Sequence, residues 1–486
     1  MILLNGGKGS DYKMRDDGLL KADLLIKNAY AVTMNKSRQI LDNAGIAVLE
    51  DKIVEIGASG EIESKYAADK TIDAKGKFVF PGFVSTHTHL FQVLLKGLGR
   101  DKPLLEWLDS SVRRALCKID KECCYYAAMT GCIEAIRTGT TTVLDYMYCH
   151  GQEDLDSSVM QAFKDIGIRG ILGRGNTKTD NFPKEFACEH NETEEMFLAE
   201  VERLALEYRG HSRLSVAIAP GVVWDVSDDG FKKIRELANR LKIPITMHLV
   251  ETEDDDEYSL RAKGMKTVPF LEKMGILGPD FIGVHCVHMT EEDIALFKKY
   301  DVKVSHNPVS NMILASGIAP VPEFIRAGIT VSLAFDGAAS NDTQDMLEVI
   351  KTAALQHKAA TRNAAAVSAS DVLEMATLGG AKAVLMEERI GSLEAGKKAD
   401  LFVYNPINAR SIPVLDPVSA IVYSSGQANV ETSVIDGRVV LENGRITNAD
   451  EEEILFRTQQ LAVELIRKAG LGNTQWGQTV KTGMLR

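Results

Sequence analysis

Short apolar runs separated by turn residues fill the stretch from residue 22 to about residue 80. These runs occupy residues 23–27, 30–34, 46–49 and 53–57. Runs of this length, bounded by turn-forming residues, are typical of β-strands. The pattern therefore predicts a small sheet domain at residues 22–80, preceded by a polar, glycine-rich arm at residues 1–21.

The rhythm changes after Pro81, where apolar runs alternate with amphipathic stretches. The apolar runs occupy residues 83–89, 142–148, 168–175, 214–220, 244–250, 281–287, 302–308 and 330–337. Amphipathic stretches lie between them, for example at residues 229–241, 291–299 and 345–358. Strands that are apolar throughout are buried on both faces, and strands that alternate with helices favour a parallel sheet. We therefore predict an α/β fold in which residues 81–384 form a (β/α)8 TIM-like barrel.

The β-rhythm returns near the end of the chain. Apolar runs at residues 399–404, 419–423 and 430–441 predict strands, with a turn at Asp436-Gly437. The simplest arrangement places residues 385–447 beside residues 22–80, so that both terminal segments build one small composite β-sandwich domain. Residues 448–486 then form a C-terminal helix and tail, because apolar residues recur at helical spacing within residues 451–469. We expect this helix to pack on the protein; a partner-binding role is the alternative.

The composition is that of an ordinary globular protein. The 486 residues are 45% hydrophobic and 26% charged, and the net charge of −12 argues against general nucleic-acid binding. No apolar stretch approaches the roughly 18 residues of a membrane span, and the first residues do not resemble a signal peptide. The number of cysteines, seven, is odd, and no Cys-x-x-Cys pair occurs. We expect a cytoplasmic protein with free thiols, no cysteine-based zinc site and no membrane contact.

Polar side chains stand at the ends of several predicted barrel strands. His87 and His89 leave the first strand side by side, because residues two apart in a strand share a face. The fifth strand ends at His248, the sixth at His285 and the eighth at Asp336. A single histidine in an apolar run is more often a buried core residue than a metal ligand. Two histidines in one strand do not decide between these two roles. Five such groups at matching strand ends instead indicate a metal site.

With these motifs the chain resembles the amidohydrolase superfamily, in the branch of mononuclear metal enzymes that deaminate s-triazines, purines, pterins and S-adenosylhomocysteine. The resemblance spans roughly residues 22–445 and includes the C-terminal segment 390–401. The motifs that carry it are His87-Thr88-His89, His248-Leu249-Val250-Glu251, His285-Cys286, Ser310-Asn311 and Asp336-Gly337-Ala338-Ala339-Ser340-Asn341-Asp342. The resemblance implies a barrel flanked by a composite β domain, which agrees with the pattern of apolar runs.

The resemblance implies that four residues bind one divalent metal ion per chain. These are His87, His89, His248 and Asp336. Three imidazoles and a carboxylate suit Zn²⁺, and Fe²⁺ is the alternative. Some branches of the superfamily bind two metals through a carboxylated lysine at the end of the third or fourth strand. Residues 173–175 and 218–220 contain no lysine, so a single metal is expected.

The same resemblance implies three catalytic residues. A metal-activated water attacks the ring, Asp336 takes its proton, and His285 forms a hydrogen bond to it. Glu251, three residues after a predicted ligand, protonates a ring nitrogen and passes a proton to the departing amine. The alternative for Glu251 is a solvated loop carboxylate, because an acidic run follows at residues 253–257.

Five further residues are candidates for binding the substrate. Gln92, three residues after His89, carries an amide that both donates to and accepts from an amino-heterocycle. Trp107 either walls the pocket or belongs to the core, and Arg174 at the end of the third strand is expected to reach a substrate oxygen or a carboxylate. Asn311 and Ser340 are expected to shape the site.

The resemblance implies a hydrolytic deaminase that replaces an exocyclic amino group on an oxo-purine, pterin or s-triazine ring with oxygen and releases ammonia. Relatives that act on adenosine-type thioethers carry a ribose-binding carboxylate where this chain has Leu105, although Glu106 is adjacent. An adenosine-type nucleoside deaminase, a triazine chlorohydrolase and a cyclic amide hydrolase remain alternatives, as does a non-catalytic scaffold. The family resemblance also implies a homo-oligomer.

Overall fold

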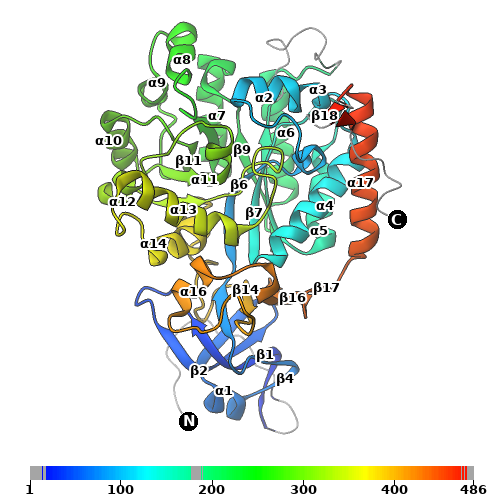
Figure 1. The fold of residues 1–486 in the computed structure, drawn as a ribbon, viewed down its shortest axis with the longest axis vertical. Coiled ribbons are helices and arrows are strands. Elements are labelled where there is room, and N and C mark those ends of the chain that lie inside the picture. The colour runs from blue at the N-terminus through cyan, green and yellow to red at the C-terminus, as the bar shows by residue number, and fades with distance from the viewer. Residues whose placement is uncertain are drawn as a thin grey trace.

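The chain forms a barrel and a separate sheet that its two terminal segments build together (Figure 1). The computed structural model describes residues 14, 18–176, 188, 190–471, 473–474 and 477–478. Most of the predicted arm at residues 1–21 and much of the tail after residue 471 lie outside these ranges. The arm and the tail therefore stay predictions.

Eight parallel strands of the described residues form the barrel, and each overlaps one of the predicted strands. In sheet order they are β13 (Val331–Leu333), β12 (Lys303–His306), β11 (Phe281–His285), β10 (Ile245–Leu249), β9 (Leu214–Ala219), β8 (Arg169–Gly175), β7 (Thr140–Met147) and β6 (Phe83–Thr88). The first and last of these strands meet where the amide of Asp336 donates to the carbonyl of His87 at 3.3 Å. The predicted TIM-like barrel is confirmed.

Helices connect the strands and cover the outside of the barrel (Figure 1). In chain order they are η1 (Leu90–Leu95), α2 (Leu104–Ser110), α3 (Val112–Leu116), α4 (Lys121–Arg137), α5 (Asp156–Ile166), α6 (Glu194–Glu207), η3 (Val223–Asp225), α7 (Asp228–Leu241), α8 (Asp255–Lys263), α9 (Thr267–Lys273), α10 (Glu291–Tyr300), α11 (Pro308–Ile313), α12 (Val321–Ala327), α13 (Met346–Thr361), α14 (Ala369–Glu374), η4 (Met375–Gly379) and α15 (Gly380–Ala383). The three amphipathic stretches named from the sequence are α7, α10 and α13. Their N-cap residues Ser227, Thr290 and Asp345 each accept a hydrogen bond from the first turn.

The second sheet joins the beginning of the chain to its end. Its described strands are β1 (Leu20–Val32), β2 (Ile40–Leu49), β3 (Lys52–Ala58), β4 (Tyr66–Asp73), β5 (Phe78–Pro81), β14 (Leu401–Tyr404), β15 (Val430–Ile435), β16 (Arg438–Glu442) and β17 (Arg445–Ile446), with α1 (Ser59–Lys65) beside β2. Strand β14 pairs antiparallel with β5, which unites the two segments. The prediction of one composite domain is confirmed, but the first two predicted strands are a single long strand, β1.

The segment between β14 and β15 differs from the prediction. The expected strand at residues 419–423 is instead part of helix α16 (Pro417–Tyr423), which η5 (Gln427–Asn429) follows. Pro417 occupies the first helical turn, and the side chain of Asp416 accepts hydrogen bonds from the amides of Val418 and Ser419. Capping therefore outweighs the β-propensity of a short apolar run.

The turn predicted between β15 and β16 is confirmed. Asp436 and Gly437 both have positive φ angles, 53° and 77°, as a two-residue hairpin turn of this kind requires. A Cβ atom on Gly437 would lie 1.8 Å from the carbonyl oxygen of Glu50, so a larger residue would collide with the backbone there.

The last long helix, α17 (Glu451–Lys468), packs against α4 on the side of the barrel (Figure 1). The hydroxyls of Thr130 and Thr458 are 2.7 Å apart, and Arg137 donates to Glu451 at 2.6 Å. The prediction of a packing helix is confirmed. Among the described residues, no helix combines the length and the apolar character needed to cross a bilayer.

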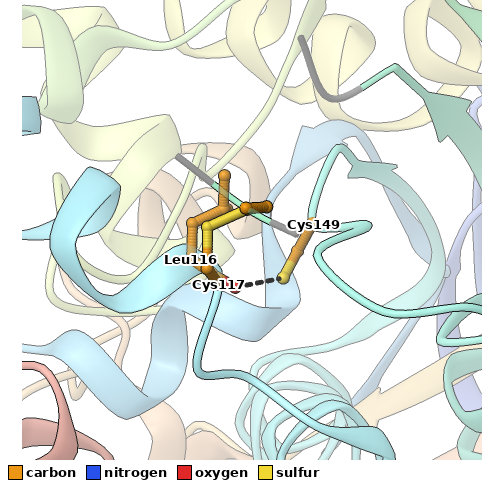
Figure 2. The surroundings of a disulfide bond; sticks show 4 residues. Leu116, Cys117 and Cys149 are labelled. Carbon is orange, nitrogen blue, oxygen red and sulfur yellow. Dashed lines mark hydrogen bonds between the residues drawn. A yellow bond between two sulfur atoms is a disulfide. The ribbon is translucent and has the colours of Figure 1, made fainter. Parts of the chain in front are cut away.

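The expectation of free thiols is wrong for two of the seven cysteines. Cys117, which ends α3, forms a disulfide with Cys188, 71 residues further along the chain. Figure 2 shows the surroundings of this bond, where the Cys149 thiol donates to the carbonyl of Leu116 at 3.5 Å. The other five cysteines are buried and free. Cysteine spacing alone did not reveal the pair, because the tertiary fold brings α3 and Cys188 together.

A buried ion-pair network joins the barrel to the composite sheet. Arg169, at the amino-terminal end of β8, donates from Nε and Nη2 to the two carboxylate oxygens of Asp400 at 2.6 and 2.9 Å. Its Nη2 also reaches Asp436 at 3.1 Å, and its Nη1 donates to the carbonyl of Ser212 at 2.6 Å. This network lies at the amino-terminal end of the barrel, opposite the carboxyl ends of the strands.

Candidate active site

Five polar side chains converge at the carboxyl ends of four barrel strands. His87 lies in β6, His248 in β10 and His285 in β11, whereas His89 directly follows β6 and Asp336 follows β13. The ring centroids of His87 and His89 are 4.6 Å apart, and those of His87 and His248 are 4.9 Å apart. The Nε2 atoms of His87 and His89 each lie 3.4 Å from one carboxylate oxygen of Asp336.

The chemistry of this cluster fits a divalent metal ion. Potential ligand atoms of His87, His89 and His248 lie within 4.8 Å of one another, and so do those of His87, His285 and Asp336. Neither ring nitrogen of His87 has a hydrogen-bond partner among the described residues, although the side chain is fully buried. Buried polar groups normally have partners, so these nitrogens fit the role of metal ligands.

The protonation of the cluster also suits a metal. Burial lowers the pKa of His89 to about 3 and lowers that of His87, which keeps both imidazoles neutral and able to bind. The Nδ1 of His89 lies 2.7 Å from the carbonyl of Tyr146. A carbonyl only accepts, so Nδ1 carries the proton and Nε2 is left as the ligand atom.

Two of the five residues leave their strands with unusual backbone conformations. His285 and Asp336 have positive φ angles of 68° and 65°, which residues other than glycine rarely adopt. The Asp336 carboxylate accepts from the hydroxyl of Ser310 at 2.5 Å and from the amide of Gly337 at 2.7 Å. Burial opposes ionisation of Asp336, but the neighbouring His87 holds the pKa of this carboxyl well below its usual range. Asp336 is therefore a fixed anion beside the histidines.

Glu251 is buried beside this cluster. Its carboxylate lies 3.4 Å from Nε2 of His285 and accepts from the hydroxyl of Ser316 at 3.2 Å. Only 6% of Glu251 is exposed, whereas Glu253 and Asp254, which follow it, are exposed to solvent. The alternative of a solvated loop carboxylate is therefore wrong. Burial raises the pKa of Glu251 to about 7, which suits a group that exchanges protons near neutral pH.

Two amides lie behind the ring of His285, and the bond to Asn311 sets its orientation. Nδ1 donates to the side-chain oxygen of Asn311 at 2.8 Å, and the side-chain nitrogen of Asn307 lies 3.2 Å from the same atom. This bond places the proton on Nδ1, so Nε2 faces Glu251 as an acceptor. Asn307 and Ser310 belong to the turn that begins α11, so one short segment supports both His285 and Asp336.

A cavity of about 420 Å³ opens above the cluster. Its deep end reaches His89, His248, Glu251, His285 and Asp336. Its remaining lining is mainly apolar and aromatic, with a few charged groups, and consists of Gln92, Leu104, Leu105, Trp107, Leu108, Val112, Arg113, Leu116, Tyr146, Tyr148, Val222, Trp224, Asp225, Thr252, Asp255, Tyr258, Leu314 and Ser340. A cavity of this size, apolar with a few polar groups, is typical of a small-molecule site.

Three of the five predicted substrate-binding residues line the cavity: Gln92, Trp107 and Ser340. The Gln92 amide donates to the hydroxyl of Tyr148 at 2.9 Å, while its oxygen is buried without a partner among the described residues. A Cβ atom on Gly337 would lie 1.9 Å from that oxygen, so a larger residue there would displace the Gln92 side chain. The indole nitrogen of Trp107 likewise has no partner among the residues that the structure describes.

The other two predicted residues, Asn311 and Arg174, are not among the described residues that line the cavity. Asn311 acts on His285 from behind. Arg174 is buried in ion pairs, 2.8 Å from Asp156 through Nε and 2.9 Å from Glu192 through Nη1. Arg174 lies at the carboxyl end of a barrel strand, where active-site residues are expected. Its guanidinium is instead paired with two carboxylates in the protein interior.

Several residues of the site were not predicted from the sequence. Tyr146 and Tyr148 face the site because they alternate along one strand, a signal comparable to that of His87 and His89. Arg113 and Asp225 line the cavity from α3 and η3. No sequence signal marked these two residues, because short connecting helices can turn a given side chain in many directions.

Comparison with known sequences and structures gives consistent matches. The sequence profile of the amidohydrolase family matches residues 78–440. A 5-methylthioadenosine/S-adenosylhomocysteine deaminase of Syntrophobacter fumaroxidans is 34% identical over 446 residues, which cover 92% of this chain and 99% of the relative. A 5′-deoxyadenosine deaminase of Methanosarcina acetivorans is 37% identical over 450 residues, which cover 92% of this chain and 99% of the relative.

Among solved structures, an adenosine deaminase of Xanthomonas campestris with bound zinc is similar over its whole length. The TM-score is 0.86 and the sequence identity is 28%, with 92% of this chain and 99% of that chain covered.

Proposed function

Because the chain belongs to the amidohydrolase family, we propose that it deaminates adenosine-type nucleosides that are modified at the 5′ position. It is a hydrolase that acts on C–N bonds other than peptide bonds. The relatives named for 5′-deoxyadenosine, 5-methylthioadenosine and S-adenosylhomocysteine support this substrate class. The expectation of an oxo-purine, pterin or s-triazine substrate gains no specific support from them.

The observation that carries the proposal is the direct contact of Glu251 and His285 at the deep end of the cavity, beside the cluster of histidines and Asp336. These residues would supply a proton donor, a hydrogen-bond acceptor and a metal-binding set to one heterocyclic ring. The wider, mainly apolar remainder of the cavity suits the sugar and a thioether or methyl group at the 5′ position.

His87, His89, His248 and Asp336 would hold one divalent metal ion, and zinc suits these donors. The zinc in the similar adenosine deaminase structure supports this choice. When bound, such an ion supplies a water that is acidic enough to act as a nucleophile near neutral pH.

Glu251 donates its proton to the ring nitrogen next to the carbon that carries the amino group. Asp336 accepts one proton from the attacking water, while His285 forms a hydrogen bond to the water and orients it. A C–O bond forms at the ring carbon, Glu251 carries the proton that remains on the new oxygen to the amino group, and the C–N bond breaks to release ammonia. The proton on Asp336 then passes to Glu251, which restores the starting state.

A free amino-heterocycle is the second candidate substrate. The side chain of Leu105 lines the cavity where the nucleoside-specific relatives of the sequence resemblance carry a carboxylate. A cavity wall that is apolar at this position favours a ligand without a sugar. The expectation of a homo-oligomer stays a prediction.

An ammonia-release assay tests the proposal. The zinc-loaded protein would be offered 5′-deoxyadenosine, 5′-methylthioadenosine and S-adenosylhomocysteine, and in parallel guanine, isoxanthopterin and melamine. We expect ammonia and the corresponding inosine derivative from at least one of the nucleosides. Turnover of the free heterocycles without turnover of any nucleoside would overturn the proposal in favour of the second candidate.

A further inference from the structure

The carboxyl of Glu251 has a second polar neighbour besides His285, and this neighbour is Ser316. The hydroxyl of Ser316 donates to Oε1 of Glu251 at 3.2 Å, whereas Oε2 lies 3.4 Å from Nε2 of His285. Only 7% of Ser316 is exposed, and Glu251 is buried as well. Each oxygen of the carboxyl thus has its own neighbour, in surroundings where water competes little for hydrogen bonds.

The backbone of Ser316 is held on both sides. Its amide donates to the carbonyl of Asn311 in α11 at 2.8 Å, and its own carbonyl lies 2.7 Å from Nε2 of His288. A carbonyl only accepts, so Nε2 of His288 carries a proton and donates to it. Ala315 turns the chain at the end of α11 with a positive φ angle of 52°. The hydroxyl of Ser316 therefore stands on a fixed backbone.

Residues 307–316 support three groups of the site. Asn311 accepts from Nδ1 of His285 at 2.8 Å, and Ser310 donates to the carboxylate of Asp336 at 2.5 Å. The third contact, to the proposed proton donor, comes from the end of the same segment. One stretch of chain after β12 thus holds the acid, the neighbouring histidine and the aspartate in one arrangement.

The hydrogen bond to Ser316 distinguishes the two oxygens of a protonated Glu251. Among the described residues, Oε1 is the one acceptor of the Ser316 hydroxyl. If Oε1 carried the carboxyl proton, it would donate to this hydroxyl and leave the hydroxyl proton buried without an acceptor, which is rare in proteins. A proton on Oε2 instead faces Nε2 of His285, which is free to accept because Nδ1 carries the ring proton.

We propose that Ser316 is a positioning residue that keeps the proton of Glu251 on Oε2, the oxygen beside His285. The inference rests on the proposed deaminase function, in which Glu251 gives this proton to a ring nitrogen. Ser316 is not among the described residues that line the cavity, so it acts through Glu251 rather than on the substrate. Without the hydroxyl, the proton divides between both oxygens and the carboxyl turns more freely, which makes the productive arrangement less frequent.

Single substitutions test this role through kcat. Both kcat and KM would be measured for the best nucleoside of the ammonia-release assay in the zinc-loaded wild type, Ser316→Ala and Ser316→Thr. We expect Ser316→Ala to lower kcat by about 3- to 10-fold, the range of one neutral hydrogen bond. KM and zinc content should stay near the wild-type values, because the cavity lining and the ligands are unchanged. Ser316→Thr keeps the hydroxyl and should recover most of kcat.

Ser259→Ala is the matched control. Ser259 is fully buried, and its hydroxyl donates to the carbonyl of Met265 at 2.8 Å rather than to Glu251. The variant loses a buried hydroxyl of the same kind, so any effect of that loss on folding appears in it as well. Its kcat should equal that of the wild type. The circular dichroism spectrum and zinc content of each variant show whether the fold is intact.

A double-mutant cycle separates positioning from packing. In the Glu251→Gln background the amide has no acidic proton to place, so adding Ser316→Ala should not lower the residual kcat any further. A packing role would lower kcat by the same factor in both backgrounds. If the residual rate is too low to measure, the recovery of kcat in Ser316→Thr decides.

Three results would overturn the inference. In the first, Ser316→Ala keeps the wild-type kcat; in the second, it lowers kcat equally with Glu251 and with the glutamine; in the third, Ser316→Ala and Ser316→Thr lose kcat equally. In each case the wild type still deaminates nucleosides, so the proposed function stands and only the role of Ser316 fails. If the zinc-loaded wild type releases no ammonia from any nucleoside, both fail together.

Discussion

The two ends of the barrel bury polar groups in opposite ways. At the amino-terminal end every guanidinium nitrogen of Arg169 has a partner, and Asp400 binds two of them through both of its oxygens. At the carboxyl end neither ring nitrogen of His87 has a hydrogen-bond partner among the described residues, and neither does the side-chain oxygen of Gln92. The side chains of Arg169, His87 and Gln92 are all almost fully buried, so the difference does not come from burial.

The difference shows which end serves stability and which end serves function. A buried polar group without a partner lowers the folding stability by about 1–3 kcal/mol. Removing one member of a fully paired, buried charge network is also destabilising, because it leaves the other charges unpaired. At the carboxyl end, the proposed metal ion would bind His87 and offset this cost. A substitution at the amino-terminal end is therefore expected to change stability, and one at the carboxyl end is expected to change activity.

Loss of the metal should have the largest effect. His248→Ala removes one of four predicted ligands, so the purified variant should contain little zinc and release no measurable ammonia. Treatment of the wild type with a chelator should give the same result, with activity restored by added zinc. Metal analysis together with the ammonia assay measures both quantities. Full activity in a metal-free protein would contradict the proposed difference between the two ends. The ring nitrogens of His87 would then be unpartnered without serving as metal ligands.

Glu251→Gln should separate catalysis from metal binding. An amide of the same size keeps the packing against Ser316 but donates no acidic proton, so kcat should fall by about 10²- to 10⁴-fold. The zinc content and the free energy of unfolding should stay near the wild-type values. Gln161→Glu, a change of the same size at an exposed position, serves as the control and should leave kcat unchanged. Equal activity in Glu251→Gln would remove this residue from the mechanism.

Asp400→Ala should affect stability rather than catalysis. It leaves Arg169 buried without its main partner, so the free energy of unfolding should fall by roughly 3–5 kcal/mol in a urea titration. Lys121→Ala, which breaks an exposed ion pair with Asp154, should cost less than about 1 kcal/mol. His87→Ala, tested without metal, should cost much less than Asp400→Ala. A similar loss in all three variants would show that the two ends do not differ.

Asn311→Ala should have the smallest of these effects. It removes the acceptor that holds Nδ1 of His285, so kcat should fall by about 10- to 100-fold, as is common for residues that orient a functional histidine. Met312→Ala, at an exposed neighbouring position, is the control. Asn311→Asp should recover part of the loss, because a carboxylate also accepts from Nδ1. A loss of stability without a change in kcat would make Asn311 a packing residue only.

Local patterns in the sequence predicted the parts of the molecule that depend on neighbouring residues. The eight apolar runs identified the barrel, because a strand buried on both faces requires apolar residues throughout. The alternation of His87 and His89 placed both rings on one face, and the rule that active sites lie at the carboxyl ends of barrel strands brought His248, His285 and Asp336 beside them. All five lie together in the structure.

Long-range packing decided the features that the sequence analysis missed. The disulfide between Cys117 and Cys188 joins residues 71 positions apart. The apolar run that was predicted as a strand is part of a helix, which Asp416 caps. Arg174 stands at a strand end like the histidines, yet its charge is paired with carboxylates that come from other segments. Spacing along the chain contains no information about these partners.

The sequence by itself determined the barrel and the set of groups that can hold a metal, since both follow from strand periodicity and from the ends of strands. Only the tertiary structure decided which polar groups face the cavity and which are paired away from it. Glu251 and Arg174 illustrate the difference: both are charged residues near strand ends, but packing exposes one to the cavity and buries the other in ion pairs. The free energy of a charged group depends on all its neighbours, and only the folded chain assembles them.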